Sequence, residues 1–212
     1  MRVLTFNVQG ANVVPGDIGA LVRSVDVDVA CLNEVRRGSA REIARAAGMN
    51  LVESAGRWRV RYRNAVLTTH KSAWSRRFRL SRTKGLPSRT LVVAGVGGIA
   101  VAATHLGLEA GERVRHASEV LVALAHFPWV ILCGDLNERP SGSVVRILSE
   151  RLKDACSSGP ATYPAGAPTA RIDYILVTPA LRVNSCEVIP LDLSDHLPVL
   201  ADIDVDPYAS GP

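Results

Sequence analysis

The sequence predicts an α+β protein in which helices cover a mixed β-sheet or a pair of β-sheets. Three observations lead to this fold class. Short apolar runs rich in β-branched residues recur along the chain, which is typical of strands. Segments with the apolar spacing of amphipathic helices lie between many of these runs. Some neighbouring runs are separated only by a tight turn, so hairpins and helical connections are expected in the same molecule.

The first half of the chain supplies five of the expected strands and two of the expected helices. A strand over residues 3–8 is followed by a helix over 16–24 and a second strand over 27–33. A helix is expected over 39–47, where Ser39 is a suitable N-cap and Gly48 a suitable C-cap. Strands are expected over 65–69, 90–96 and 99–105, and Gly97-Gly98 between the last two predicts a tight hairpin, since both positions can take positive φ.

The second half continues the alternation. A helix is expected over residues 109–126, a strand over 130–133 and a helix over 141–152 with Ser141 as its N-cap. Residues 157–170 are rich in Gly, Pro, Ala and Ser and are expected to form a loop. Strands are then expected over 172–177, 183–189 and 199–203.

Length and composition narrow the class of protein. The chain has 212 residues, of which 47% are hydrophobic, and this is sufficient for one domain, expected over residues 1–206 with a frayed tail over 207–212. No run of about eighteen apolar residues occurs, so no membrane span is expected. The N-terminus lacks the regions of a signal peptide, and a cytoplasmic location is the expectation. The four cysteines have neither C-x-x-C nor zinc spacing and are expected to be buried reduced thiols: Cys31, Cys133, Cys156 and Cys186.

The chain is basic, with a formal net charge of +5 and a pI of about 9.3. Much of the excess lies in one stretch: Arg57, Arg59, Arg61, Arg63, Arg76, Arg77, Arg79, Arg82, Lys84 and Arg89. A basic surface favours polyanions such as nucleic acids or anionic lipid headgroups. The alternative for the same stretch is a solvated surface with no ligand.

Polar residues occur where the expected strands end. Asn7 ends the first strand, Glu34 follows the second and His105 ends the hairpin strand. In Gly134-Asp135-Leu136-Asn137, Asp135 and Asn137 are two residues apart and would point the same way on an extended chain. A carboxylate can take a proton or orient water, and an amide can hydrogen-bond a phosphate oxygen. Taken alone, the tetrapeptide is also compatible with a structural turn.

Two further polar sites lie near the C-terminus. Asp173 interrupts an apolar strand in Arg171-Ile172-Asp173-Tyr174, and an unpaired buried carboxylate is costly. Asp195 and His196 lie together in Ser194-Asp195-His196-Leu197, which places a hard oxygen ligand beside an imidazole. Asp173 is therefore expected to pair with His196 at roughly 2.6–3.2 Å, fixing its tautomer and favouring its charged form.

These residues, in the order Asn…Glu…His…Gly-Asp-x-Asn…Asp…Ser-Asp-His, resemble the endonuclease/exonuclease/phosphatase (deoxyribonuclease-I-like) superfamily, and most of all its small bacterial members. The match runs from Thr5-Phe6-Asn7 to Asp195-His196. The resemblance implies a four-layered α/β/β/α sandwich, with two mixed sheets packed face to face and helices outside. It also implies a Mg²⁺- or Mn²⁺-dependent hydrolase acting on phosphoester bonds.

The resemblance also implies roles for individual residues. Three residues would bind the metal: Glu34, Asn7 and Asp195. Asp135 would activate or orient the attacking water, Asn137 would position substrate, and His196, paired with Asp173, would contact the scissile phosphate, with His105 at the phosphate or leaving group. Substrate binding is assigned to Asn64, Arg63 and Arg115; Arg113 and His116 on the same helix are weaker candidates, with a solvated helix face as the alternative. Asn33 departs from the family, where glutamine is the more usual residue before the metal-binding glutamate.

The expected function is therefore hydrolysis of a phosphodiester by in-line attack of an activated water, with DNA or RNA as the leading substrate. A small phosphoester or a lipid headgroup is the alternative substrate. A catalytically silent scaffold that binds a phosphate-bearing partner is the second class of function. The number of metal ions, the endo- or exonucleolytic mode and the oligomeric state stay open.

Overall fold

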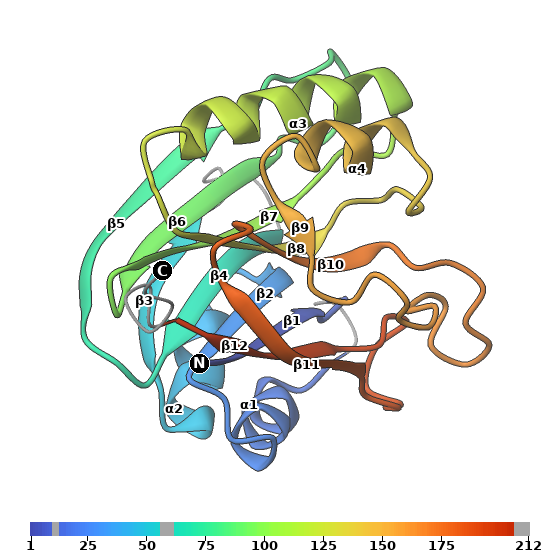
Figure 1. The fold of residues 1–212 in the computed structure, drawn as a ribbon. Helices are drawn as coiled ribbons and strands as arrows, with labels where there is room; N and C mark the ends of the chain where they lie inside the picture. The colour runs from blue at the N-terminus through green and yellow to red at the C-terminus, as the bar shows by residue number, and fades with distance from the viewer. Residues whose placement is uncertain (10–12, 56–61, 206–212) are drawn as a thin grey trace.

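The computed structural model describes residues 1–9, 13–55 and 62–205, which form two six-stranded sheets and four helices (Figure 1). The first sheet has the order β11-β12-β1-β2-β4-β3, formed by β1 (Arg2–Asn7), β2 (Val29–Arg36), β3 (Asn50–Ala55), β4 (Tyr62–Thr68), β11 (Arg182–Val188) and β12 (Val199–Asp204). The second has the order β5-β6-β7-β8-β10-β9, formed by β5 (Ser72–Arg79), β6 (Thr90–Val96), β7 (Ile99–His105), β8 (Val130–Asp135), β9 (Lys153–Asp154) and β10 (Asp173–Val177). The helices are α1 (Pro15–Ser24), α2 (Ser39–Ala47), α3 (Ala110–Leu124) and α4 (Ser143–Leu148).

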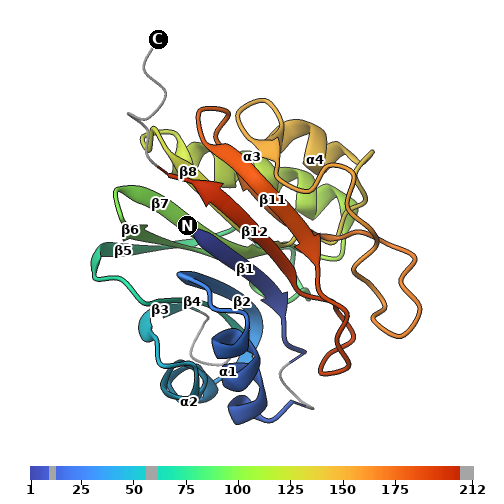
Figure 2. The ribbon, with the colours of Figure 1, turned by 60° about the horizontal axis from the view of Figure 1, so that its bottom comes forward.

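Three apolar clusters hold these elements in four layers. The central cluster lies between the two sheets and contains Val29, Cys31, Val101 and Ile131 among others. A second cluster packs α3 and α4 on the outer face of the second sheet, and a third packs α1 and α2 on the outer face of the first. Figures 1 and 2 show the helix pairs on opposite sides of the molecule. The expected α/β/β/α sandwich is confirmed.

Strand direction brings several strand termini to one edge of the sandwich. β1 runs parallel to β2, and β7 runs parallel to β8, so these four strands finish at that edge. β12 and β10 are antiparallel to their neighbours and therefore start there. In the second sheet, Asp135 is paired in register with both His105 and Asp173. The edge thus collects residues that are far apart in the sequence.

The expected strands and helices are present, but three strands were not expected. β3 and β9 have no clear apolar run, and β9 has only two residues. β5 is an edge strand with mostly exposed or half-buried side chains, and its arginines made it look like a charged segment without strand character. Edge strands commonly carry such charges because they discourage pairing with other chains. The fourth helix, expected over 141–152, is limited to α4 (Ser143–Leu148).

Several expectations fall outside the described residues. Arg57, Arg59 and Arg61 of the basic stretch lie there, as do residues 207–212, which were expected to be frayed. Among residues 1–9, 13–55 and 62–205, no helix has the length and apolar character needed to cross a membrane. All four cysteines are free thiols, three of them buried and Cys186 half-buried.

Candidate active site

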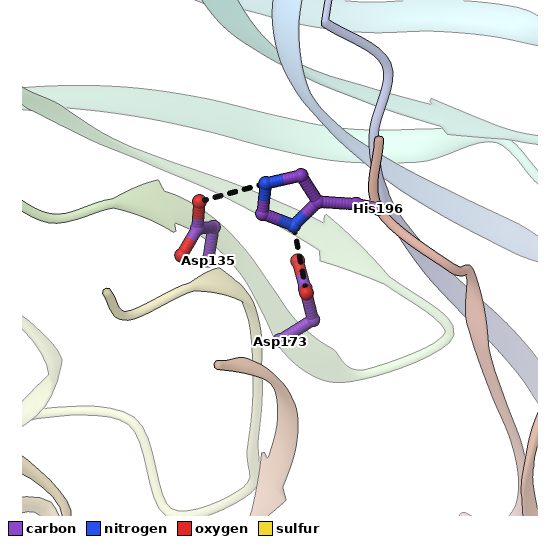
Figure 3. A group of neighbouring side chains, drawn as sticks. All are labelled: Asp135, Asp173 and His196. Atoms are coloured by element: carbon purple, nitrogen blue, oxygen red, sulfur yellow. Dashed lines mark hydrogen bonds and ion pairs between the residues drawn. The ribbon is translucent and has the colours of Figure 1, made fainter. Parts of the chain in front are cut away.

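The expected contact between Asp173 and His196 is present at the edge where the strands meet. His196 Nδ1 lies 2.9 Å from Asp173 Oδ2, and both side chains are almost fully buried (Figure 3). Thr162 Oγ1 donates a hydrogen bond of 2.7 Å to the same carboxylate oxygen. Burial alone would lower the pKa of His196, but its hydrogen bond to Asp173 and the charges of Asp173, Asp135 and Asp195 raise that pKa to about 9. The imidazole is therefore positively charged near neutral pH.

Asp135 lies on the other side of this imidazole. Its Oδ2 atom is 3.8 Å from His196 Nε2 and accepts a hydrogen bond of 3.0 Å from Asn7 Nδ2. Its Oδ1 atom accepts the backbone N–H of Asn137 at 2.8 Å. Burial, followed by repulsion from Asp173, raises the pKa of Asp135 to about 7. A carboxylate with a pKa near neutrality can both take up and release a proton under physiological conditions.

His105 joins the same cluster as a neutral imidazole. Burial lowers its pKa well below the usual value, and the charges of Arg89 and His196 act in the same direction. Its Nε2 atom lies 3.1 Å from Asn137 Nδ2 and 3.4 Å from Asp135 Oδ2. Because the Asn137 amide donates, Nε2 is the acceptor and the ring proton is on Nδ1, which faces Glu34 Oε1 at 3.7 Å. Asn137 therefore fixes the tautomer of His105.

Glu34 reaches the site through an irregularity in β2. The sequence pattern placed it after the end of a strand, whereas β2 continues to Arg36 and the register with β4 shifts between Leu32 and Val35. Glu34 has a φ of 55°, a left-handed conformation that is unfavourable for a residue with a side chain. Burial raises the pKa of Glu34, and the charge of Arg89 opposes that shift. Backbone strain at this position is consistent with a functional role for the carboxylate.

Asp195 is held at the end of β1 by side-chain hydrogen bonds. Its Oδ2 atom accepts a bond of 3.0 Å from Gln9 Nε2. Ser194 Oγ donates to the backbone oxygen of Asn7 at 2.8 Å, which ties this loop to the strand that carries Asn7. Gln9 was not singled out in the sequence, because nothing in its local pattern indicates a contact 186 positions away.

Asn33 links the two sheets directly behind these residues. Its amide nitrogen donates to Asn64 Oδ1 and to the backbone oxygen of Thr104, both at 2.9 Å, and its Oδ1 atom accepts the backbone N–H of Asp135 at 2.9 Å. Gly134 leaves room for this link: a Cβ atom there would lie 1.8 Å from the Thr104 oxygen. Asn33 therefore positions the backbone that carries Asp135. These contacts are the role in this fold of Asn33, the residue that departs from the family's usual glutamine.

An open cleft lies beside Glu34 and His105. It has a volume of about 250 Å³, and its lining includes Asn64, Arg63 and Arg89. Asn64 is buried, and its amide nitrogen donates 2.7 Å to the backbone oxygen of Thr90, so its polar atoms already serve the contact between the sheets. Arg89 was noticed in the sequence only as part of a basic stretch. In the fold, burial lowers the pKa of its guanidinium, and the carboxylates of Asp135 and Glu34 counteract that effect.

The basic candidates on α3 do not line this cleft. Arg115 is exposed and donates to Thr83 Oγ1 at 2.9 Å. His116 is fully buried, with Nε2 2.7 Å from the Ser81 oxygen and Nδ1 3.4 Å from the Gly107 nitrogen. It is neither on a solvated helix face nor facing substrate, because the helix uses this side chain to hold the segment that leads to β6. Arg113 forms an ion pair of 3.3 Å with Glu138.

The charges of the cluster fit a divalent cation. Burial is the main cause of the raised pKa values of Glu34 and Asp135, and a nearby carboxylate raises each further: Asp195 for Glu34 and Asp173 for Asp135. Ligand atoms of Asp135, Asp173 and His196 lie within 4.8 Å of one another and could hold an ion. Asp173 and His196, however, are already hydrogen-bonded to each other, and a metal ion coordinated by both would break that hydrogen bond. Glu34 and Asp195 offer hard oxygen atoms without this conflict.

The fold and this cluster place the chain among the α/β/β/α sandwich proteins that gather carboxylate, amide and imidazole groups at one edge of two sheets. The family model described as "Endonuclease/Exonuclease/phosphatase family" matches residues 4–196. The chain belongs to this family, whose members are phosphoester hydrolases. No curated protein matches its sequence.

Solved structures agree with the family assignment. A mannosyl-6-phosphatase from Bacteroides thetaiotaomicron has a TM-score of 0.85 and 18% identity, over 96% of this chain and 99% of that one. A 3′ phosphatase, NExo, from Neisseria bound to a product DNA hairpin has a TM-score of 0.80 and 17% identity, over 96% and 99%. TDP2 from D. rerio, complexed with a single-strand DNA product, has a TM-score of 0.77 and 17% identity, over 97% and 99%. Identities this low show a shared fold.

Proposed function

We propose that this protein is a Mg²⁺- or Mn²⁺-dependent phosphodiesterase whose leading substrate is a nucleic acid. The observation that carries the proposal is the contiguous group of Asp173, His196, Asp135 and His105, joined by contacts of 2.9, 3.8 and 3.4 Å. It combines a charged imidazole, a carboxylate with a pKa near 7 and a neutral imidazole in one buried cluster. A silent scaffold would have no need for ionisable groups tuned in these different directions.

The side chains divide the work of an in-line displacement at phosphorus. Asp135 orients the attacking water and accepts its proton, with Asn7 and Asn137 holding the carboxylate in place. His196 presents Nε2–H to a non-bridging oxygen of the scissile phosphate, while Asp173 keeps that imidazole charged. His105 faces the same phosphate or the leaving oxygen. The new P–O bond forms to the water oxygen, and the bond to the leaving oxygen breaks.

Glu34, Asn7 and Asp195 are the residues we assign to the metal. When bound, the cation supplies charge neutralisation on the phosphoryl oxygens. Glu34 is suited to this role because it is only 26% exposed and its raised pKa indicates that its charge lacks full compensation.

Nucleic acid is favoured as substrate by charge. The chain has a formal net charge of +5, and Arg63 and Arg89 line the cleft beside the cluster. Two structural neighbours were solved with DNA products, which supports the choice. The third neighbour is a mannosyl-6-phosphatase, which keeps a small phosphoester as the second candidate.

The central test is hydrolysis with and without metal, using bis-p-nitrophenyl phosphate, DNA, RNA, inositol phosphates and sphingomyelin. We expect turnover with Mg²⁺ or Mn²⁺ and none in EDTA. Glu34→Gln should reduce turnover by about 100-fold or more, since it removes several kcal/mol of transition-state stabilisation. Its affinity for Mn²⁺, measured by calorimetry, should fall as well.

Glu42→Gln on the exposed first turn of α2 is the matched control and should keep full activity. Full activity of the wild type in EDTA would exclude the metal-dependent reaction. Normal activity and normal Mn²⁺ affinity of Glu34→Gln would exclude the assignment of Glu34.

A further inference from the structure

A second cavity lies next to the active-site cleft and shares one wall with it. This cavity has a volume of about 530 Å³, and its lining includes Arg37, Gly38, Arg41 and Arg63. Arg63 also lines the cleft of about 250 Å³ that contains Glu34 and His105. The side chain of Arg63 is therefore the boundary between the two, and an extended ligand in the cleft would reach the second cavity by passing Arg63.

The two cavities differ from the catalytic cluster in charge. Arginines supply every charged side chain in the second cavity, and Arg63 and Arg89 face a single carboxylate, Glu34, in the first. The Nε atoms of Arg63 and Arg89 are buried and have no hydrogen-bond partner in the described part of the chain. Buried donors without partners are costly, so an acceptor from outside the protein would satisfy them.

The second cavity is lined in part by Ala40, Leu51 and Val52, whereas the apolar lining of the first includes an aromatic ring. Tyr62, Pro87 and Leu108 line the first cavity, and Leu108 is 70% exposed although it is a large apolar residue. Its volume is below the roughly 300–1,000 Å³ of pockets that enclose drug-sized ligands, so it suits one small, partly apolar group such as a base or a sugar. The second cavity instead ends at the start of α2, where no side chain caps the helix. The backbone N–H groups in the first turn of α2 add to the attraction for an anion.

We propose that the two cavities receive successive units of a single nucleic-acid strand. The nucleoside attached to the scissile phosphate lies against Tyr62, Pro87 and Leu108. The next phosphate along the strand is bound by Arg37, Arg41 and Arg63. This inference rests on the proposed function. It predicts that the enzyme prefers substrates with a second phosphate, one nucleoside away from the scissile phosphate, and that these three arginines cause the preference.

The test uses chromogenic substrates that differ by one unit at a time. Bis-p-nitrophenyl phosphate has no nucleoside, and p-nitrophenyl esters of thymidine monophosphate have a nucleoside but no second phosphate. The p-nitrophenyl esters of thymidine 3′,5′-bisphosphate have both, and both positional isomers are used to cover either strand polarity. Water attacks phosphorus and p-nitrophenolate leaves in every case. For the wild type, the second phosphate should lower KM by about tenfold in one isomer, which corresponds to one or two charge-assisted hydrogen bonds.

Arg41→Ala and Arg63→Ala should each remove most of this gain in KM, with a smaller effect on kcat. The matched control is Arg45→Ala, which removes the same charge from an exposed position one turn further along α2, outside the lining of either cavity. Arg45→Ala should keep the tenfold preference. Loss of the preference in Arg45→Ala as well would mean that net charge alone produces it and would overturn the assignment.

A binding measurement separates this inference from the proposed function. In Ca²⁺ or EDTA, calorimetry should show tighter binding of thymidine 3′,5′-bisphosphate than of either monophosphate, and Arg41→Ala should abolish the difference. If the protein binds with this preference but hydrolyses none of the esters, the proposed hydrolase activity is excluded, and the binding of a nucleic-acid strand by the two cavities is retained. If bis-p-nitrophenyl phosphate is hydrolysed and KM is equal for substrates with and without the second phosphate, the hydrolase activity is retained and the binding of a second phosphate by the arginines is excluded. Tighter binding of inositol 1,4-bisphosphate than of the nucleotide would also overturn the proposal.

Discussion

Asp173 has one carboxylate oxygen fully engaged and the other without a partner. Oδ2 accepts from His196 Nδ1 and from Thr162 Oγ1, whereas Oδ1 is buried and has no hydrogen-bond partner among the described residues. A carboxylate buried in this way is tolerated because the positive charge of His196 lies beside it. The Asp173–His196 pair therefore links two properties: the positive charge of the His196 imidazole, and the ionisation of Asp135, the second carboxylate that this imidazole faces.

Replacing Asp173 with Asn tests this coupling through the pH dependence of kcat/KM. In the wild type, activity should rise as Asp135 loses its proton near pH 7 and fall as His196 loses its proton near pH 9. Asp173→Asn removes a negative charge, which lowers the pKa of both groups, so both limbs of the profile should shift to lower pH. The turnover number should fall by about 100-fold or more, with little change in substrate affinity, because the amide keeps the shape without the charge.

Asp28→Asn is the matched control for this prediction. Asp28 is paired with His70 at 3.2 Å on an exposed surface away from the cluster. Its replacement should leave the limbs of the profile where they are. An unchanged alkaline limb in Asp173→Asn would mean that Asp173 does not hold the charge of His196.

At the scale of elements, the contact between β2 and the second sheet fixes where Asp135 lies. Asn33 in β2 uses both amide atoms to reach β4, β7 and β8, and Asn64 in β4 extends the link to Thr90 at the start of β6. Two sheets packed only through apolar side chains can adjust relative to one another. Hydrogen bonds that cross the interface restrict such adjustment, because a shift would leave buried polar groups unpaired.

Asn33→Ala should therefore destabilise the fold as well as the site. It leaves the Thr104 carbonyl, the Asn64 amide and the Asp135 N–H short of a partner, which predicts a loss of about 2–4 kcal/mol in the free energy of unfolding. Urea denaturation followed by circular dichroism measures it. Asn50→Ala, an exposed position in β3 of the same sheet, should cost less than about 0.5 kcal/mol. Equal losses for the two variants would show that the hydrogen bonds between the sheets add nothing to the free energy of unfolding.

At the scale of the whole molecule, positive charge extends beyond the cavities. β5 carries exposed Arg76, Arg77 and Arg79 along the open edge of the second sheet, and Arg76 lies over the ring of Trp74 at 5.8 Å. Trp74 itself stacks on Phe127 with ring centroids 5.0 Å apart. This ring is therefore used in packing, whereas the arginines remain accessible to a polyanion or to solvent.

Replacing Arg76, Arg77 and Arg79 together by Ser distinguishes these roles. If they contact nucleic acid, the affinity for duplex DNA should depend less on salt, by about 0.9 in the log–log slope for each phosphate contact that is lost. Fluorescence anisotropy across a range of salt concentrations gives the slope. The control replaces three exposed arginines on other elements by Ser: Arg23, Arg146 and Arg182. Identical slopes for the wild type and the β5 variant would assign β5 to a solvated edge.

The sequence alone predicted the layered fold class and named most residues of the candidate cluster. Hydrophobic patterning predicted strands such as β1, β6 and β7, because buried strands need apolar side chains along their whole length. Asp173 was predicted to contact His196 because an isolated buried carboxylate would be too costly. In the structure, Asp173 Oδ2 lies 2.9 Å from His196 Nδ1. β5 escaped prediction, since an edge strand with arginines lacks the apolar pattern.

Only the tertiary structure decided which side chains serve the site and which support it. Asn33, Gln9 and Thr162 contact the cluster through partners that are distant in sequence or reached by a turn, and no local pattern reports such contacts. His116, a candidate for substrate contact, is instead buried beneath the segment leading to β6. The two cavities meet at Arg63 because the loop after β2 packs beside β4. Sequence pattern fixes which residues must be buried or paired, whereas the packing of the sheets selects their partners.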